Sequence, residues 1–199
     1  MIIGFDFDNT IVCYDKAISI LAEQRFDLPG DVPRTKIGIR DHLRALGREE
    51  DWTRFQGELY GPGMVHAELF EHVLAALESL AAFGHTLTII SHRTRFPYLG
   101  ERHDLHAFAG NWVRERLPAV FSSVSFHESK VDKIAMIART GCQIFLDDLP
   151  EILLDPAFPS STHGILFSPN GDAHLWTGEL ITSWRGLGAA VETCVNPRG

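Results

Sequence analysis

The chain has 199 residues, of which 45% are hydrophobic and 22% are charged, a composition typical of a globular protein. This length fits one domain with a sizeable insertion, or one core with a small lid. The formal net charge of -8 argues against a general nucleic-acid binder, whose surface is normally basic, but it is compatible with an anionic substrate held locally.

The cysteines and the apolar runs bear on the cellular compartment. Three cysteines, odd in number and far apart, argue against a disulfide framework and favour a reducing compartment. The N-terminus lacks the basic region and the apolar run of a signal peptide. No apolar stretch approaches the roughly 18 residues needed to span a bilayer. We therefore expect a cytoplasmic protein with no membrane partner.

The first motif is the stretch Ile-Ile-Gly-Phe-Asp-Phe-Asp-Asn-Thr at residues 2–10. Apolar residues dominate it as in a buried parallel strand, and Asp6 and Asp8 stand at the carboxyl end, where ligands bind in such sheets. Because an unpaired buried carboxylate is costly, the pair indicates half of a magnesium site. Taken alone, the stretch is equally compatible with a strand ending in an acidic turn, with Asp8 or Asn9 capping the next element.

Residues 13–83 contain no convincing strand. Apolar residues at helical spacing predict helices over about 17–27, 35–47, 52–59 and 65–84. An ordinary connection within an α/β unit is far shorter. We therefore expect residues 13–83 to form a helical cap domain, and residues 1–12 and 84–199 to form the core domain.

Residues 85–91 predict the second strand, which ends in Ser91 and is followed by His92 and Arg93. A hydroxyl followed by basic side chains suits a phosphoryl oxygen, which accepts several hydrogen bonds at once. Ser91 alone is also typical of a helix cap. A loop rich in arginine and aromatic residues follows, beginning at Arg95, and loops at strand ends often hold substrate.

Further along, Asp104 is expected to cap a helix, and residues 121–126 alternate apolar residues with serine as a third strand. Ser129 then predicts a helix start, with Lys130 and Lys133 in the first turns. The helix dipole disfavours cations there, which hints at a function, although solvated surface lysines are the commoner explanation.

A fourth strand is predicted over residues 142–146, and the adjacent carboxylates Asp147 and Asp148 at its tip mirror the first motif. A short fifth strand is expected over 164–167, and a closing helix in the tail around Trp184.

Four strand ends thus carry, in order, Asp-x-Asp-x-Thr, a serine, a lysine-bearing helix start and Asp-Asp. This ordered set resembles the haloacid dehalogenase-like (HAD) hydrolase superfamily, in its Asp-x-Asp-x-Thr phosphatase branch. The matching residues are Asp6, Asp8, Thr10, Ser91, Lys130 or Lys133, Asp147 and Asp148. The resemblance implies an α/β fold, a Rossmann-like three-layer sandwich with a parallel central sheet, and a small α-helical cap between the first and second motifs.

The resemblance also implies roles for the matching residues. Asp6 is expected to be the nucleophile that forms an aspartyl-phosphate, and Asp8 the general acid and base. Mg²⁺ is expected on the Asp6 carboxylate, the Asp8 backbone carbonyl and Asp147, with Asp148 supporting them. Ser91 is expected to bind the phosphoryl oxygens together with the motif lysine.

The motif lysine has two candidates. Lys133 lies nearer the acidic strand in sequence and is the first choice, while Lys130 fits the usual placement almost as well. The candidate substrate-binding residues are Thr10, Asn9, His92, Arg93 and Arg95.

The expected function is a magnesium-dependent phosphatase acting on a small phosphorylated metabolite, a nucleotide or a sugar phosphate. Asp8 argues for phosphoryl chemistry, because members of the superfamily that act on carbon–halogen bonds lack this second aspartate. The alternatives are a phosphotransferase or mutase, and a catalytically silent protein that binds a phosphorylated ligand. No nucleic-acid partner is expected, and the oligomeric state is left open. The expected cap residues that select substrate are Arg34, Lys36, Arg40 and Arg44.

Overall fold

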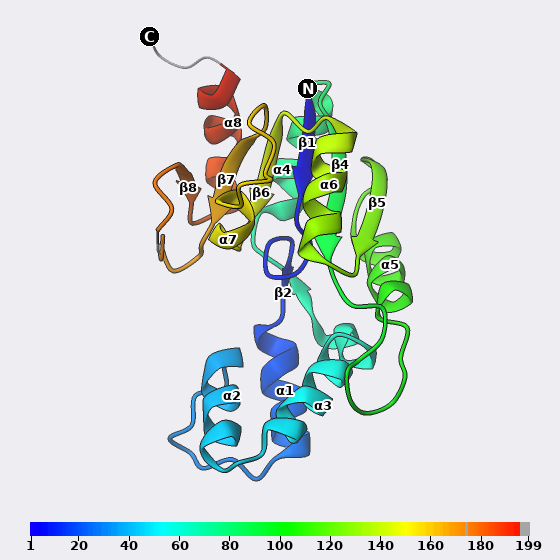
Figure 1. Ribbon diagram of the computed structural model, residues 1–199, viewed down its shortest axis with the longest axis vertical. Helices are drawn as coiled ribbons and strands as arrows, with labels where there is room; N and C mark the ends of the chain where they lie inside the picture. Colours follow the sequence, from blue (N-terminus) through cyan, green and yellow to red (C-terminus); the bar gives the residue numbers. More distant parts are fainter. Residues whose placement is uncertain (174, 196–199) are drawn as a thin grey trace. The chain divides into compact units, whose positions relative to one another are not determined.

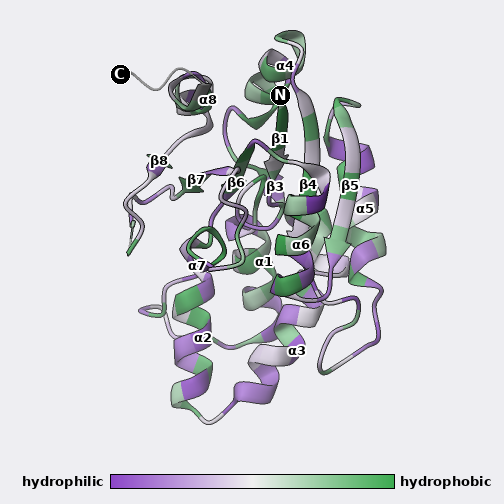
Figure 2. Ribbon diagram, turned by 45° about the horizontal axis from the view of Figure 1, so that its top comes forward, coloured by the Kyte–Doolittle hydropathy of each residue, from purple (hydrophilic) through white to green (hydrophobic). Residues whose placement is uncertain are grey.

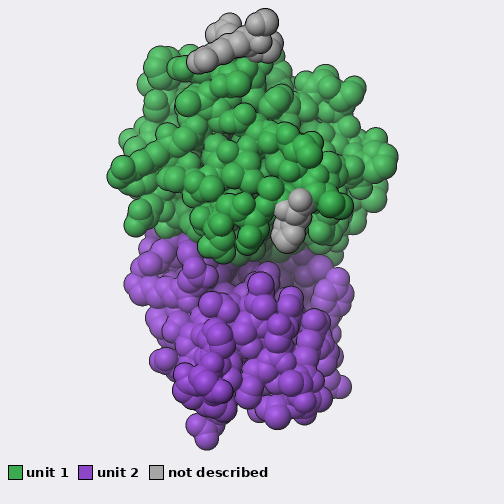
Figure 3. Space-filling model, turned by 90° about the vertical axis from the view of Figure 1, so that its left-hand side faces the viewer, with its two compact units in different colours: residues 1–12, 69–93, 117–199 green, residues 13–68, 94–116 purple. Residues whose placement is uncertain are grey.

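The computed structural model describes residues 1–173 and 175–195, and the chain divides into two units (Figure 3). The first unit comprises Met1–Val12, Leu69–Arg93 and Leu117–Gly199, and the second comprises Cys13–Glu68 and Thr94–Arg116.

A six-stranded sheet with the order β5-β4-β1-β6-β7-β8 lies at the centre of the first unit (Figure 1). The strands are β1 (Ile2–Phe5), β4 (Thr86–His92), β5 (Phe121–His127), β6 (Ile144–Asp147), β7 (His163–Phe167) and β8 (Glu179–Ile181). All five neighbouring pairs are parallel, as predicted. The carboxyl ends of β4, β1 and β6 therefore lie side by side at one edge of the sheet.

Helices cover both faces of this sheet, which gives the predicted three-layer arrangement (Figure 1). The helices of the first unit are α4 (Val73–Ala82), α6 (Lys130–Thr140), α7 (Pro150–Leu153) and α8 (Leu187–Val195), with a 3₁₀ turn η2 at Trp184–Gly186. Side chains of α6 and α7 pack with strand residues in a buried cluster of Ile90, Ile134, Ile137, Cys142, Phe145, Ile152, Leu153 and Leu166. The hydrophobic colour of β1 in Figure 2 agrees with a strand covered on both sides.

The second unit is built from α1 (Asp15–Arg25), α2 (Lys36–Ala45), α3 (Glu49–Leu59), a 3₁₀ turn η1 (Pro62–His66) and α5 (Leu105–Arg116). Thr35 caps α2 as predicted, since its Oγ1 accepts a hydrogen bond from the Gly38 N–H at 3.1 Å. The buried faces of α1, α2 and α3 pack on one another, and the ribbons of α2 and α3 carry many hydrophilic residues (Figure 2). Two short strands, β2 (Val12–Cys13) and β3 (Glu68–Leu69), pair at the residues where the chain passes between the units.

The division differs from the predicted one, 13–83 as cap, in two places. Helix α4 belongs to the first unit, because it packs against β4 and α8. Residues 94–116, which were expected in the core domain, belong to the second unit, because α5 packs against η1.

Other elements also differ from the sequence pattern, and β3 is a strand within residues 13–83, where none was expected. The helix expected from residue 65 starts only at Val73, because His72 at its N-cap adopts a left-handed conformation with φ 69°. Strand β8 was not predicted, because three residues are too few to show a two-residue alternation. Among the described residues, no helix is long and apolar enough to cross a bilayer.

Candidate active site

The first motif forms a tight loop directly after β1. The Asp6 N–H donates to the Leu146 carbonyl at 2.8 Å, which keeps the start of the loop beside β6. The N–H groups of Ile11 and Val12 both donate to the Phe7 carbonyl, at 3.1 and 3.0 Å, and close the turn. Asn9 adopts a left-handed backbone with φ 57°, a conformation that asparagine tolerates better than most residues. This loop places Asp6 and Asp8 at the carboxyl edge of the sheet.

A buried lysine connects the first and the fourth motif. Lys133, on α6, is 1% exposed, and its Nζ lies 2.6 Å from Asp6 Oδ1 and 2.6 Å from Asp147 Oδ2. The contact with Asp6 is a hydrogen bond, while the contact with Asp147 is an ion pair without hydrogen-bond geometry. Asp147 Oδ1 accepts a hydrogen bond from the Leu149 N–H at 3.0 Å. One cation thus bridges two carboxylates that come from adjacent strands.

Burial and neighbouring charges shift the pKa values of Asp6 and Lys133. It raises the pKa of Asp6 to about 7, and the negative charges of Asp147 and Asp8 raise it as well, while Lys133 lowers it. For Lys133, burial opposes the charged form, but the charges of Asp147 and Asp6 outweigh burial and raise its pKa. Lys133 is therefore protonated. The single positive charge of Lys133 does not offset the effects of burial, Asp147 and Asp8 on Asp6, so the pKa of Asp6 stays raised.

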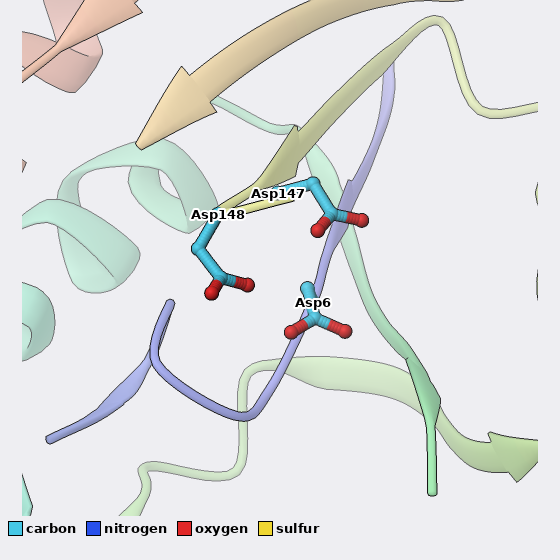
Figure 4. A group of neighbouring side chains, drawn as sticks. All are labelled: Asp6, Asp147 and Asp148. Carbon is cyan, nitrogen blue, oxygen red and sulfur yellow. The ribbon is translucent and has the colours of Figure 1, made fainter. Parts of the chain in front are cut away.

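Three carboxylates lie close together next to Lys133. Asp6, Asp147 and Asp148 each offer an oxygen within 4.8 Å of the others (Figure 4). The Thr10 hydroxyl donates to Asp148 Oδ1 at 3.4 Å and links the two acidic loops. When all three carboxylates are ionised, the single positive charge of Lys133 leaves an excess of two negative charges. Oxygen ligands and this charge excess fit a hard divalent cation such as Mg²⁺.

Asp8 has a different partner. Arg93 donates from Nε to Asp8 Oδ2 at 3.0 Å and from Nη2 to Asp8 Oδ1, so one guanidinium holds both carboxylate oxygens. The side chain of Arg93 is 3% exposed and that of Asp8 is 18% exposed. The structure places Arg93, which was expected to bind substrate, on the proposed acid and base.

Ser91 lies near the carboxyl end of β4. It lies fully buried in β4, whose neighbour β1 carries Asp6 at its end. Its Oγ has no hydrogen-bond partner among the described residues. A buried hydroxyl without a partner is costly, so this group is available to an incoming oxygen.

The other predicted residues divide between those near the site and those elsewhere. Lys130 does not reach the carboxylates, because it stands at the first position of α6 and pairs with Glu151, with a side chain that is 45% exposed. Of the two candidate lysines, Lys133 is the one that contacts Asp6 and Asp147. Arg95 lies in the second unit, where it pairs with Asp104 at 3.0 Å. His92 is half-buried at the end of β4, and burial lowers its pKa, which favours the neutral imidazole.

The expected cap residues that select substrate make local contacts in the second unit. The Arg34 guanidinium donates to the carbonyls of Pro29, Val32 and Leu28, and so fixes the loop before α2. The other contacts are Arg40 with Asp41, Arg44 with Glu49, and Lys36 over the ring of Tyr60.

Trp184 is a supporting residue that the sequence reasoning assigned only to a closing helix. Its Nε1 donates to the Thr10 carbonyl at 3.0 Å, and its ring stacks on Phe5 at 5.6 Å. It therefore anchors the far end of the first loop. No local pattern signals this role, because the contact spans 174 positions of the chain.

Several solved structures that match most of this chain are described as HAD-superfamily hydrolases. A predicted phosphatase from Clostridium acetobutylicum matches with a TM-score of 0.66 and 12% identity over 96% of this chain and 97% of that chain. A predicted phosphoglycolate phosphatase from Haemophilus somnus matches with a TM-score of 0.59 and 14% identity over 96% and 97%. YfnB from Bacillus subtilis, bound to magnesium, matches with a TM-score of 0.60 and 13% identity over 94% and 96%.

No protein-family model and no curated protein matches the sequence. The chain therefore has the HAD-like fold on the evidence of structure, at sequence identities too low to carry an activity across.

Proposed function

We propose that this protein is a phosphatase that hydrolyses a small phosphorylated metabolite with the help of Mg²⁺. The observation that carries the proposal is Lys133, a buried cation 2.6 Å from two carboxylates at the end of a parallel sheet. A buried ion cluster of this kind adds little stability compared with apolar residues of similar volume, so a catalytic task accounts for it better than packing does.

The chemistry assigns two steps to the side chains. In the first, Asp6 attacks the phosphorus, the bond to the leaving oxygen breaks, and Asp8 gives that oxygen a proton. In the second, water attacks the aspartyl-phosphate, Asp8 takes up the proton, and inorganic phosphate leaves Asp6. Lys133 and the Ser91 hydroxyl donate hydrogen bonds to the phosphoryl oxygens as their charge redistributes.

The cluster of Asp6, Asp147 and Asp148 would hold the metal. Asp6, Asp147 and the backbone carbonyl of Asp8 are the proposed ligands, with Asp148 behind them, and the charge excess of this group supports the choice of a divalent cation. When bound, Mg²⁺ neutralises the charge of a phosphoryl group.

The proposed substrate class is a small phosphate monoester. The proposed site has a nucleophile, two phosphoryl-binding donors and an acidic cluster, and the formal net charge of -8 disfavours a polynucleotide substrate. One structural neighbour is described as a predicted phosphoglycolate phosphatase, which makes phosphoglycolate a natural member of the test panel. Nucleoside monophosphates and sugar phosphates complete the panel. We propose that the second unit is the cap domain.

The test is phosphate release from this panel with Mg²⁺, with Asp6→Asn as the matched variant. The expected result is release from one substrate class that needs Mg²⁺ and disappears in Asp6→Asn. Release that survives in Asp6→Asn, or binding of a phosphorylated ligand with no release by the wild type, would overturn the proposal. An added alcohol acceptor separates transfer from hydrolysis, because a transferase would phosphorylate the alcohol.

A further inference from the structure

We infer that Arg93 is a positioning residue that orients the Asp8 carboxylate for proton transfer and does not bind the substrate phosphate. The inference rests on the proposed function and adds to it a residue outside the four motifs.

The first argument is the geometry of the pair. Nε and Nη2 of Arg93 each donate to a different oxygen of Asp8, the first at 3.0 Å. A two-pronged pair of this kind fixes both the position and the plane of a carboxylate, which a single hydrogen bond does not. A substrate phosphate could bind to this Nε–Nη2 edge only by displacing Asp8. The edge is already used by Asp8.

The second argument is that Arg93 is itself held in place. Its backbone N–H donates to the His127 carbonyl at 2.8 Å, which continues the pairing of β4 with β5 past the last strand residue. Its guanidinium lies over the ring of Phe7, 5.6 Å from the ring centre. Phe7 precedes Asp8 in the same loop. The arginine therefore contacts two consecutive residues of the loop that carries the nucleophile.

The third argument is burial. The Arg93 side chain is 3% exposed, and a buried cation is retained only with a partner that satisfies it. A surface ion pair would give a weak and mobile constraint, whereas here the arginine is buried and the Asp8 side chain is only 18% exposed. The rate of proton transfer depends steeply on the position of the acid. Fixing the Asp8 carboxylate is therefore expected to affect the catalytic rate more than the free energy of unfolding.

The experiment is a double-mutant cycle with Arg93→Gln, Asp8→Asn and the double variant, measured as kcat and KM on the substrate found in the panel. The expected result for Arg93→Gln is a fall in kcat of about 10- to 100-fold with KM within about twofold, since general acid–base catalysis contributes about 10²- to 10⁴-fold. The double variant should be no slower than Asp8→Asn, because Arg93 acts through Asp8.

Two further variants guard against a folding defect. Arg93→Lys keeps the charge but loses the two-pronged geometry, and it should recover at most part of the lost kcat. In Arg93→Ala, added guanidinium at millimolar concentration should restore part of kcat by occupying the vacated space. Arg139→Gln is the control, because that exposed arginine of α6 contacts only Met136 among the contacts described and should leave kcat unchanged.

The outcomes separate the two proposals. Losses that multiply in the double variant, or a raised KM with an unchanged kcat, would show that Arg93 binds substrate and would overturn the inference while the phosphatase stands. A wild-type protein without any phosphate release would overturn the proposed function, and the inference with it.

Discussion

Lys133 is the residue whose surroundings constrain the proposed chemistry most. It is 1% exposed, contacts Asp6 and Asp147 at 2.6 Å each, and has its pKa raised by both. A cation in this position favours the ionised form of Asp6, the proposed nucleophile, against the burial that raises its pKa, and it attracts a phosphoryl group. Lys130, three positions earlier on α6, offers the same side chain in an exposed setting. A substitution of Lys130 is therefore a matched control for the same substitution of Lys133.

We expect Lys133→Gln to lower kcat by about 10²- to 10³-fold, the usual cost of removing one donor that stabilises transition-state charge. Lys130→Gln should stay within about twofold of the wild type, because an exposed ion pair contributes little. Steady-state kinetics on the two variants provide the measurement. Equal losses, or a larger loss for Lys130→Gln, would contradict the assignment of Lys133.

Asp6 leads to a prediction about pH. Its pKa in the folded protein is about 7, above the ordinary value of 3.8, so ionisation is less favourable in the folded state than in the unfolded state. Without metal, the stability that Asp6 contributes is therefore fully present below about pH 4 and is lost as the pH rises through about 7. A divalent cation binds the ionised carboxylate and competes with the proton.

Mg²⁺ should therefore raise Tm more at pH 8 than at pH 5.5. Thermal melts at both pH values, with and without Mg²⁺, measure the difference. In Asp6→Asn, which cannot ionise at this position, most of the difference should vanish. A Mg²⁺ effect of the same size at both pH values in the wild type would argue against binding at Asp6.

The sequence indicated candidate site residues wherever a carboxylate or a hydroxyl stood at the end of a predicted strand. Asp6, Ser91 and Asp147 were identified because carboxylates and a hydroxyl at the ends of parallel strands stand out locally. Their geometry agrees with that expectation. The role of Arg93 was not predictable, because its partner Asp8 is 85 positions away and the pairing depends on the adjacency of β1 and β4.

At the scale of the elements, Gly4 shows how closely β1 and β6 approach at the site. A Cβ built on Gly4 would lie 2.5 Å from the Phe145 ring and 2.9 Å from Cys142 Sγ. Both neighbours belong to the packed layer between the sheet and α6. The glycine thus allows the Phe145 ring of β6 to cover β1, which leads into the loop with Asp6 and Asp8.

We expect Gly4→Ala to destabilise the protein by about 1–3 kcal/mol, the usual cost of overpacking a dense core. Gly188→Ala is the matched control: it lies in α8 with nothing within 4 Å of an added Cβ, and removing a helix glycine should stabilise by about 0.5–1 kcal/mol. Urea denaturation of both variants measures the difference. A Gly4→Ala variant as stable as the wild type would show that Phe145 moves aside freely.

Elements with local signals were predicted well, and those set by tertiary context were not. Ser129 caps α6 as expected, its Oγ accepting a hydrogen bond from the Asp132 N–H at 3.1 Å, because the capping signal lies within three residues. The apolar spacing of residues 65–69, in contrast, continues the helical pattern of α4, although the chain there forms η1 and β3. Apolar residues at helical spacing also occur by chance where a segment packs irregularly.

At the scale of the whole molecule, the chain builds two units that each have buried residues of their own. The carboxylates, Lys133, Ser91 and Arg93 all belong to the first unit. A cation bound there at 100 times its Kd stabilises the state that holds it by about 2.7 kcal/mol. Local opening of a protein occurs in cooperative units, and a ligand protects the unit whose opening destroys its site.

We therefore expect Mg²⁺ to slow amide hydrogen exchange in β1 and β6, which carry the proposed ligands, and to leave α2 and α3 of the second unit unchanged. Hydrogen exchange followed by mass spectrometry, with and without Mg²⁺, resolves the two regions. Asp147→Asn removes a proposed ligand and should abolish the protection in β1 and β6. Equal protection of α2 and α3 would mean that the two units open together, so that the metal site stabilises the whole chain as one cooperative unit.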